Sequence, residues 1–400
     1  MIASVDLERL GLHRGGHLLL KRALKQLQPG ELLQVQGIAP DLPIHLRAWC
    51  RAQGHGLVLH PEDGRSIAII QRGDADLGRW HRAERAGASD ARSAGAVVDE
   101  PLAHWGLAAR GAYVEAGSPE FTFSLNDKCE VWADEAARLY AQAAAAQWDP
   151  ATAIDWSVAF DLPEEIEDAV VQVMTFLIEN ETAALLVPAR FLAQLHPHFR
   201  EVMQFLAIQT ADEARHIEVF TRRASLHRPQ LGLSTAGGQQ SLKTLIDEPD
   251  FALASFLLSV LGEGSFLHLL WFLRDYGPDP LTRQVADLAA KDEARHVAFG
   301  MAHLTRHSQH DPSLRARLAQ AIHSRHQALQ HTAGLNEEVF DALMLIAAGS
   351  WLPQDLATGH KRVVQLTQAM EQGRRKRLIR LGFVEAEAVE LSGLHTRNFM

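Results

Sequence analysis

The sequence contains one pentapeptide, Asp-Glu-Ala-Arg-His, twice, and the two copies end at His216 and His296. In each copy a glutamate (Glu213 or Glu293) lies three residues before the histidine, so on a helix the two side chains share a face. Carboxylate oxygen and imidazole nitrogen are ligands of divalent transition metals. The repeated pair therefore predicts two helices that each contribute a glutamate and a histidine to a metal centre.

A further glutamate precedes each copy inside an apolar stretch. These are Glu181 in TFLIENETAALLV and Glu263 in FLLSVLGEGSFLHLL. Glu179 is the alternative to Glu181, but two residues turn a helix by about 200°, so only one of them can face the centre. We prefer Glu181 because Asn-Glu-Thr-Ala occupies the same place as Gly-Glu-Gly-Ser around Glu263.

The spacing of these residues predicts their arrangement. Pro197 lies halfway between Glu181 and Glu213, and Pro278 lies halfway between Glu263 and Glu293. A turn at each proline makes two antiparallel helical hairpins, and the long crossover around 228–240 joins them into a four-helix bundle. The predicted metal ligands at its centre are Glu181, Glu213, His216, Glu263, Glu293 and His296.

Four buried carboxylates without compensating charge would cost many kcal/mol. Two divalent cations balance them, and oxygen ligands with two nitrogens suit iron or manganese while leaving positions open for oxygen. Asp212 and Asp292 can accept the free ring N–H of the ligand histidines, and Arg215 and Arg295 can balance these aspartates.

The rest of the chain predicts two further parts. Residues 1–73 read as βαβαββ, with the last two strands joined by a turn at 61–64, and this order predicts a small two-layer α/β domain. Residues 74–100 are small, charged and aperiodic, as in a linker. From 101 to 400 apolar residues recur at helical spacing. The predicted fold is therefore mainly α, a bundle with extra helices preceded by the α/β domain.

Composition narrows the functional classes. The 400 residues include 39 lysines and arginines against 49 aspartates and glutamates, a net charge of -10 that argues against nucleic-acid binding. The basic run RRKR at 374–377 is interpreted as a solvated helix end. The start lacks the apolar core of a signal peptide, and apolar runs such as 251–262 end too soon to cross a bilayer. Two cysteines make no disulfide framework. We expect a cytoplasmic protein without nucleic-acid or membrane partners.

The duplicated motifs resemble the ferritin-like di-iron carboxylate superfamily, in which Glu and Glu-x-x-His recur on four helices. NETAALLVPARF and EGSFLHLLWFL, each followed by DEARH, are most similar to its oxygen-activating members, the hydroxylases and N-oxygenases. The resemblance covers residues 165–305. It implies a ferritin-like four-helix bundle in which the six ligands hold two Fe ions, or a Mn/Fe pair, that activate O₂.

Two positions depart from patterns within that superfamily. Multicomponent hydroxylases carry a threonine four residues after the third glutamate, where this chain has Leu267. Proton delivery to bound oxygen must therefore differ. The small subunit of ribonucleotide reductase carries a tyrosine four residues after the first Glu-x-x-His, where this chain has Phe220. A stored tyrosyl radical is therefore not expected.

The amino-terminal domain resembles the TusA-like sulfur carriers in its βαβαββ order and in the segment LERLGLHRGGHLLLKRALKQLQPGELLQV. Arg14 stands where that family carries its cysteine, so persulfide transfer from this position is excluded. Cys50 is interpreted as a buried core thiol. Docking of a protein partner, or shaping of substrate access, is the expected role of this domain.

The predicted function is a non-haem di-iron monooxygenase or oxidase that uses O₂ to hydroxylate, N-oxygenate or otherwise oxidise a small organic substrate. Without a glycine-rich nucleotide loop or a cysteine cluster, electrons must come from a separate donor or from the substrate. A homodimer is expected. The alternative is an iron-binding or sensing protein that docks a partner without substrate turnover.

Overall fold

The computed structural model describes residues 2–62, 65–74, 80–329 and 337–394. Residues 63–64 of the predicted turn and 75–79 of the predicted linker lie outside these ranges. The chain divides into two compact units, the first made of residues 1–97 and 102–122, the second of 98–101 and 123–400.

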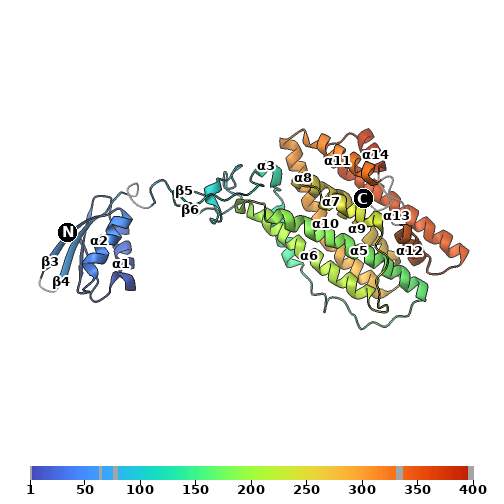
Figure 1. Cartoon of the computed structure of the whole chain (residues 1–400), viewed down its shortest axis with the longest axis horizontal. Coiled ribbons are helices and arrows are strands. Elements are labelled where there is room, and N and C mark those ends of the chain that lie inside the picture. Colours follow the sequence, from blue (N-terminus) through green and yellow to red (C-terminus); the bar gives the residue numbers. More distant parts are fainter. Residues whose placement is uncertain (1, 63–64, 75–79, 330–336, 395–400) are drawn as a thin grey trace. The chain divides into compact units, whose positions relative to one another are not determined.

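An α/β domain occupies the start of the first unit. Its elements are β1 (Ala3–Asp6), α1 (Gly16–Lys25), β2 (Leu32–Gly37), α2 (Leu42–Gln53), β3 (Gly56–Glu62) and β4 (Arg65–Gln71). The four strands form one sheet in the order β1-β2-β4-β3, in which β1 and β2 are parallel and the other pairs antiparallel. Figure 1 shows α1 and α2 against this sheet. Their apolar faces and the sheet enclose a core that includes Leu20, Leu33 and Leu46.

Cys50 belongs to this core. It is 1% exposed, and burial raises the pKa of its thiol to about 12. A thiol with so high a pKa is a poor nucleophile near neutral pH. Its interpretation as a core residue is therefore confirmed.

A second part of the first unit falls partly within the predicted linker. Strands β5 (Glu84–Arg85) and β6 (Tyr113–Val114) pair antiparallel, and Val114 of β6 and Ala86, which follows β5, are buried. Residues 102–122 thus belong to the first unit, whereas the sequence pattern began the helical domain at 101.

The second unit is helical. Its elements are α3 (Lys128–Val131), α4 (Ala136–Ala145), α5 (Glu164–Leu192), α6 (Arg200–Ala224), α7 (Ala236–Ile246), α8 (Phe251–Ser255), the π-helix η5 (Phe256–Glu263), α9 (Gly264–Tyr276), α10 (Pro280–His310), α11 (Leu314–Leu329), α12 (Glu337–Ala348), α13 (Pro353–Arg380) and α14 (Glu385–Gly393). The predicted fold class, a mainly α bundle preceded by a small α/β domain, is confirmed.

Four long segments form the bundle. Helix α5 packs along α6, and the α8–η5–α9 segment packs along α10 (Figure 1). The turns fall at the predicted prolines, since a short 3-10 helix begins at Pro197 and Pro278 separates α9 from α10. The crossover between the two hairpins contains α7, which the sequence pattern did not predict.

One predicted helix is interrupted. Glu263 was predicted to lie on a helix of the bundle, and within that segment Phe256–Glu263 is π-helical rather than α-helical. A π-helix is wider than an α-helix and needs room. Gly300 on α10 provides it, because a Cβ there would lie 2.6 Å from Ser259 Cβ.

Two helical segments, Glu164–Leu192 and Phe251–Tyr276, are long and apolar enough to cross a membrane. The inference that the apolar runs of this sequence are too short to cross a bilayer is therefore wrong. Their most apolar windows are 61% and 89% buried inside the protein. This burial is typical of core helices, and it accounts for their composition.

Candidate metal centre

The structure brings all six predicted ligands together at the centre of the bundle. Each is 4% exposed or less. Helix α5 contributes Glu181, η5 contributes Glu263, and α6 and α10 each contribute a glutamate and a histidine. The structure thus places Glu181 in the cluster, whereas Glu179 lies outside it and is partly exposed.

The six side chains form two overlapping groups. Glu181 and His216 belong to the first and Glu263 and His296 to the second, while Glu213 and Glu293 belong to both. Within each group one ligand atom per residue lies within 4.8 Å of the others. Two metal positions that share two carboxylates follow from this overlap.

Both histidines direct Nδ1 into the cluster. Nδ1 of His216 lies 3.2 Å from Glu213 Oε2 and 3.4 Å from Glu293 Oε1. Nδ1 of His296 lies 3.1 Å from Glu213 Oε1 and 3.4 Å from Glu293 Oε2. The second nitrogen of each ring, Nε2, points away from the shared carboxylates.

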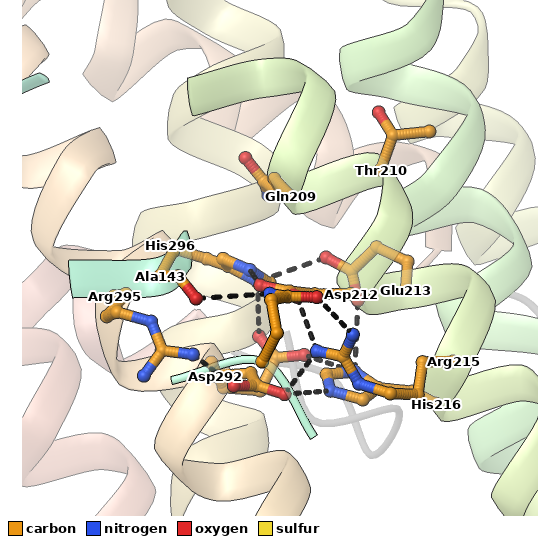
Figure 2. A network of polar contacts seen from close by, with 12 residues as sticks. Ala143, Gln209, Thr210, Asp212, Glu213, Arg215, His216, Asp292, Arg295 and His296 are labelled. Atoms are coloured by element: carbon orange, nitrogen blue, oxygen red, sulfur yellow. Dashed lines mark hydrogen bonds and ion pairs between the residues drawn. The ribbon is translucent and has the colours of Figure 1, made fainter. Parts of the chain in front are cut away.

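The outward nitrogens pair crosswise between the two motifs. His216 Nε2 lies 3.2 Å from Asp292 Oδ2, and His296 Nε2 lies 3.2 Å from Asp212 Oδ2 (Figure 2). Each aspartate therefore orients the histidine of the other copy. A carboxylate on the outer nitrogen fixes the ring and its tautomer, as it does behind many metal-bound histidines.

Arg215 links the two aspartates. It contacts Asp212, and its Nη2 donates to Asp292 Oδ2 at 2.9 Å (Figure 2). Arg295 also contacts Asp292. These guanidinium groups offset the negative charge that the aspartates bring into the core.

Sequence reasoning missed three further contacts. Trp148 Nε1 donates to Asp292 Oδ2 at 2.8 Å. Gln147 Nε2 donates to Asp212 Oδ1 at 2.8 Å, and Gln209 Nε2 donates to Glu263 Oε1 at 2.9 Å. Gln209 was detectable, because it lies one helical turn before Glu213. The other two are in an irregular segment whose position only the folded chain defines.

Burial and mutual charge set the protonation of the carboxylates. Burial, with the charge of Glu293, raises the pKa of both Glu181 and Glu263 well above the usual range. Burial alone would also raise the pKa of Glu213, but the positive charges of the adjacent His296 and His216 lower it.

The histidines respond in the opposite sense. Burial alone would lower their pKa values, but nearby carboxylates raise them well above the usual range: Glu181 does so for His216, and Glu213 for His296. Without metal, protons therefore supply part of the positive charge that the four glutamates require.

The donor set fits a pair of metal ions. Both carboxylate oxygens of Glu213, one each of Glu263 and Glu293, and His296 Nδ1 are buried and have no hydrogen-bond partner in the described part of the chain. Buried polar atoms are almost always bonded, so such a concentration of unsatisfied acceptors requires an explanation. Coordination of divalent cations satisfies these atoms and neutralises the glutamates.

The π-helix that carries Glu263 is held by a distant helix. Arg377 of α13 donates from Nε to Val260 O at 2.7 Å, and its guanidinium lies over Gly264. The neighbouring Arg374 is 3% exposed. The interpretation of the basic run as a solvated helix end is therefore wrong for these two residues, although Arg375 and Lys376 are exposed.

A small pocket opens beside the cluster. Among its lining residues are the ligands Glu181, Glu263 and Glu293, and its other wall is mainly apolar. That wall consists of Asn180, Ala184, Leu242, Leu245, Leu258, Gly262 and Phe266. The ligands thus border a small, mainly apolar pocket.

Two hairpins that close around shared carboxylates form a ferritin-like fold with a centre suited to two metal ions. Solved structures share the fold. A point mutant of R2-like ligand-binding oxidase with an aerobically reconstituted Mn/Fe cofactor aligns with a TM-score of 0.50 and 19% identity, over 61% of this chain and 92% of that chain.

Two more solved structures are similar. A mutant of R2-like ligand-binding oxidase with an anaerobically reconstituted Mn/Fe cofactor has a TM-score of 0.49 at 19% identity and covers 61% of this chain and 93% of that one. A mutant with an Fe/Fe cofactor has a TM-score of 0.48 at 19% identity, over 61% and 92%. No protein-family model and no curated protein sequence matches this chain.

Proposed function

We propose that this protein is a non-haem dimetal oxidase that uses O₂ to oxidise a small organic substrate by hydroxylation, N-oxygenation or dehydrogenation. The observation that carries the proposal is the buried set of four glutamates and two histidines with its unsatisfied acceptor atoms. Two iron ions, or a manganese and an iron, suit this donor set, and the solved structures of similar fold carry Mn/Fe or Fe/Fe cofactors.

The residues of the chain have separate roles in this proposal. Glu213 and Glu293, which belong to both ligand groups, would be shared by the two metal ions, and each of the other four ligands would hold one ion. Asp212 and Asp292 orient the histidines, and Gln209 orients Glu263. When bound, the metals supply the redox chemistry that reduces O₂.

The apolar wall beside the ligands has a complementary role. Leu242, Leu245, Leu258 and Phe266 exclude water from the side of the cluster that Glu181, Glu263 and Glu293 face. A dry site protects a reactive centre from side reactions with water. The same wall would hold an apolar part of the substrate. The reaction also requires electrons, and we propose an external donor.

Metal content is the first test. The parent chain, expressed in iron-replete medium, is expected to hold about two iron ions, or one iron and one manganese, as two positions with shared carboxylates require. Glu213→Ala and Glu293→Ala are each expected to lose both ions because each removes a bridging ligand. Glu218→Ala changes an exposed carboxylate on the same helix as Glu213 and should retain them. A parent chain without bound transition metal contradicts the proposal.

Oxygen consumption is the second test. With a reductant and a panel of small organic compounds, the metal-loaded parent is expected to consume O₂ in proportion to product, and Glu293→Ala is not. Uptake of many iron ions per chain without product would instead indicate iron storage or sensing, which is the alternative.

A further inference from the structure

A second group of potential ligands lies in the α/β domain, separate from the bundle. His13 is in the short 3-10 helix Leu12–Arg14, Asp41 precedes α2, and His45 is in the first turn of α2. Nδ1 of His13 and Nδ1 of His45 each lie 3.3 Å from Asp41 Oδ2. The two imidazole rings meet edge to face, with centroids 5.3 Å apart.

The carboxylate of Asp41 is directed to the histidines rather than to its own helix. An aspartate at the N-cap position usually accepts a hydrogen bond from a backbone N–H of the first turn. Asp41 occupies that position of α2 and makes no such bond. Its Oδ2 lies instead between the two Nδ1 atoms.

Nδ1 of His45 makes no other polar contact among the described residues. His45 Nδ1 is buried and makes no hydrogen bond within the described residues. Gly11 leaves room for the ring of His13, because a Cβ at residue 11 would lie 2.8 Å from His13 Cε1. The absence of a side chain at Gly11 thus allows the ring of His13 to lie next to Asp41.

These three residues offer a metal ion two nitrogens and one oxygen. One ligand atom from each lies within 4.8 Å of the others, which a cation at the centre of the three can contact. Three protein ligands with a fourth position left open are typical of tetrahedral zinc sites that bind a further ligand. The side chains of His13, Asp41 and His45 are 50%, 40% and 39% exposed, so a cation can enter from solvent.

A groove borders two of the three residues. His13 and Asp41 line it with Arg9, Arg14 and the Ile38–Pro40 segment, and its volume is about 420 Å³. Arg14 Nε lies 3.1 Å from His13 Nε2 and donates to it. A metal on Nδ1 requires the proton on Nε2, so Arg14, which is exposed, must release the ring when metal binds.

We infer that His13, Asp41 and His45 form a binding site for a divalent transition metal such as zinc, with a further coordination position accessible from solvent. This site does not depend on the proposed oxidase function, because none of its residues contributes to the centre in the bundle.

Zinc titration of the full-length chain near neutral pH, in competition with a chromophoric chelator, tests the inference. The parent is expected to bind one zinc ion at this site with a Kd below about 1 μM. His45→Gln and Asp41→Asn are expected to bind one ion fewer, with that affinity reduced by at least about 100-fold. His81→Gln changes an exposed histidine of the same unit and should match the parent.

The Arg14→Gln variant sharpens the test. It removes a positive charge and the hydrogen bond that competes for His13, so zinc is expected to bind severalfold more tightly. Equal stoichiometry and affinity in the parent and His45→Gln would overturn the inference, as would weaker binding by Arg14→Gln. Zinc bound at the bundle centre is retained in His45→Gln, so the loss of one ion in that variant reports on the site in the α/β domain alone. If the bundle centre bound no metal, the parent and His45→Gln would both lack those ions, and the two proposals therefore fail in distinguishable ways.

Discussion

At the scale of single residues, the centre depends on which nitrogen each histidine offers. Both rings direct Nδ1 to the glutamates and Nε2 to an aspartate of the other motif. The ring is therefore held from both sides, and the aspartate that holds it is itself fixed by arginine. Each copy of the pentapeptide therefore provides metal ligands together with an aspartate, and that aspartate orients the histidine of the other copy.

This arrangement predicts the effect of Asp292→Asn. Asp292 accepts from Trp148 and Arg215 and contacts His216 Nε2, and an amide cannot replace the charge that these groups meet. We expect metal affinity to fall by about 10–100-fold, measured by competition with a chelator. Asp287→Asn, which changes a partly exposed carboxylate on the same helix, is the control. Parent-like affinity in Asp292→Asn would show that the contact does not position His216.

At the scale of elements, the π-helix is the segment that the site requires and that periodicity did not indicate. Its widened turns carry Glu263 into the cluster, and two contacts stabilise them. Gly300 permits the close approach of α10, and Arg377 bonds to the carbonyl of Val260. Because π-helices are rare and intrinsically less favourable, such external contacts are required to maintain one.

The same contacts predict the effect of Gly264→Ala. The added Cβ would lie 2.5 Å from Arg377 Cζ, so the guanidinium must move and its bond to Val260 O is lost. We expect the free energy of unfolding of the helical unit to fall by about 1–3 kcal/mol. Metal binding should also weaken because Glu263 is the adjacent residue.

Chemical denaturation and a metal titration check this expectation. Gly393→Ala is the control, because a Cβ there would have no neighbour within 4 Å. If Gly264→Ala left both the unfolding free energy and the metal affinity unchanged, the packing of Arg377 on the π-helix would have no consequence for the site.

At the scale of the whole molecule, the helical unit buries several polar side chains away from the metal centre. His303 on α10 is fully buried, and its Nε2 donates to Glu130 O at 2.6 Å. Burial lowers the pKa of His303 from 6.5 to about 4. The folded protein therefore keeps this histidine neutral at a pH where the unfolded chain protonates it.

The sign of the pH effect follows. The folded pKa is depressed, so stability is fully present above pH 6.5 and falls as pH decreases from about 6.5 towards about 4. The shift corresponds to a loss on the order of 3 kcal/mol at the lower limit. His303→Gln does not titrate and is expected to show a shallower fall in unfolding free energy, measured by denaturation at several pH values.

His310→Gln provides the matched control. This residue is exposed on the same helix, so its replacement should leave the pH dependence of the parent unchanged. Parallel pH profiles for the parent and His303→Gln would exclude His303 as a source of acid sensitivity.

Much of the centre was predictable from the chain alone. The pairing of glutamate with histidine follows from helical geometry, and the two hairpins follow from prolines midway between ligands, because both depend on separations along a covalent chain of known rise. The order of strands and helices in the α/β domain was also predictable, because each element shows its own periodicity of apolar residues in the local sequence.

Only the tertiary structure decided the remaining features. The crosswise contacts of Asp212 and Asp292, the bond from Trp148, the π-helix and the meeting of His13 with His45 all join segments whose distance depends on packing. A local sequence pattern indicates on which face of its helix or strand a residue lies, but it does not indicate which distant element packs against that face. The ligands were therefore predictable from sequence, whereas the groups that orient them were not.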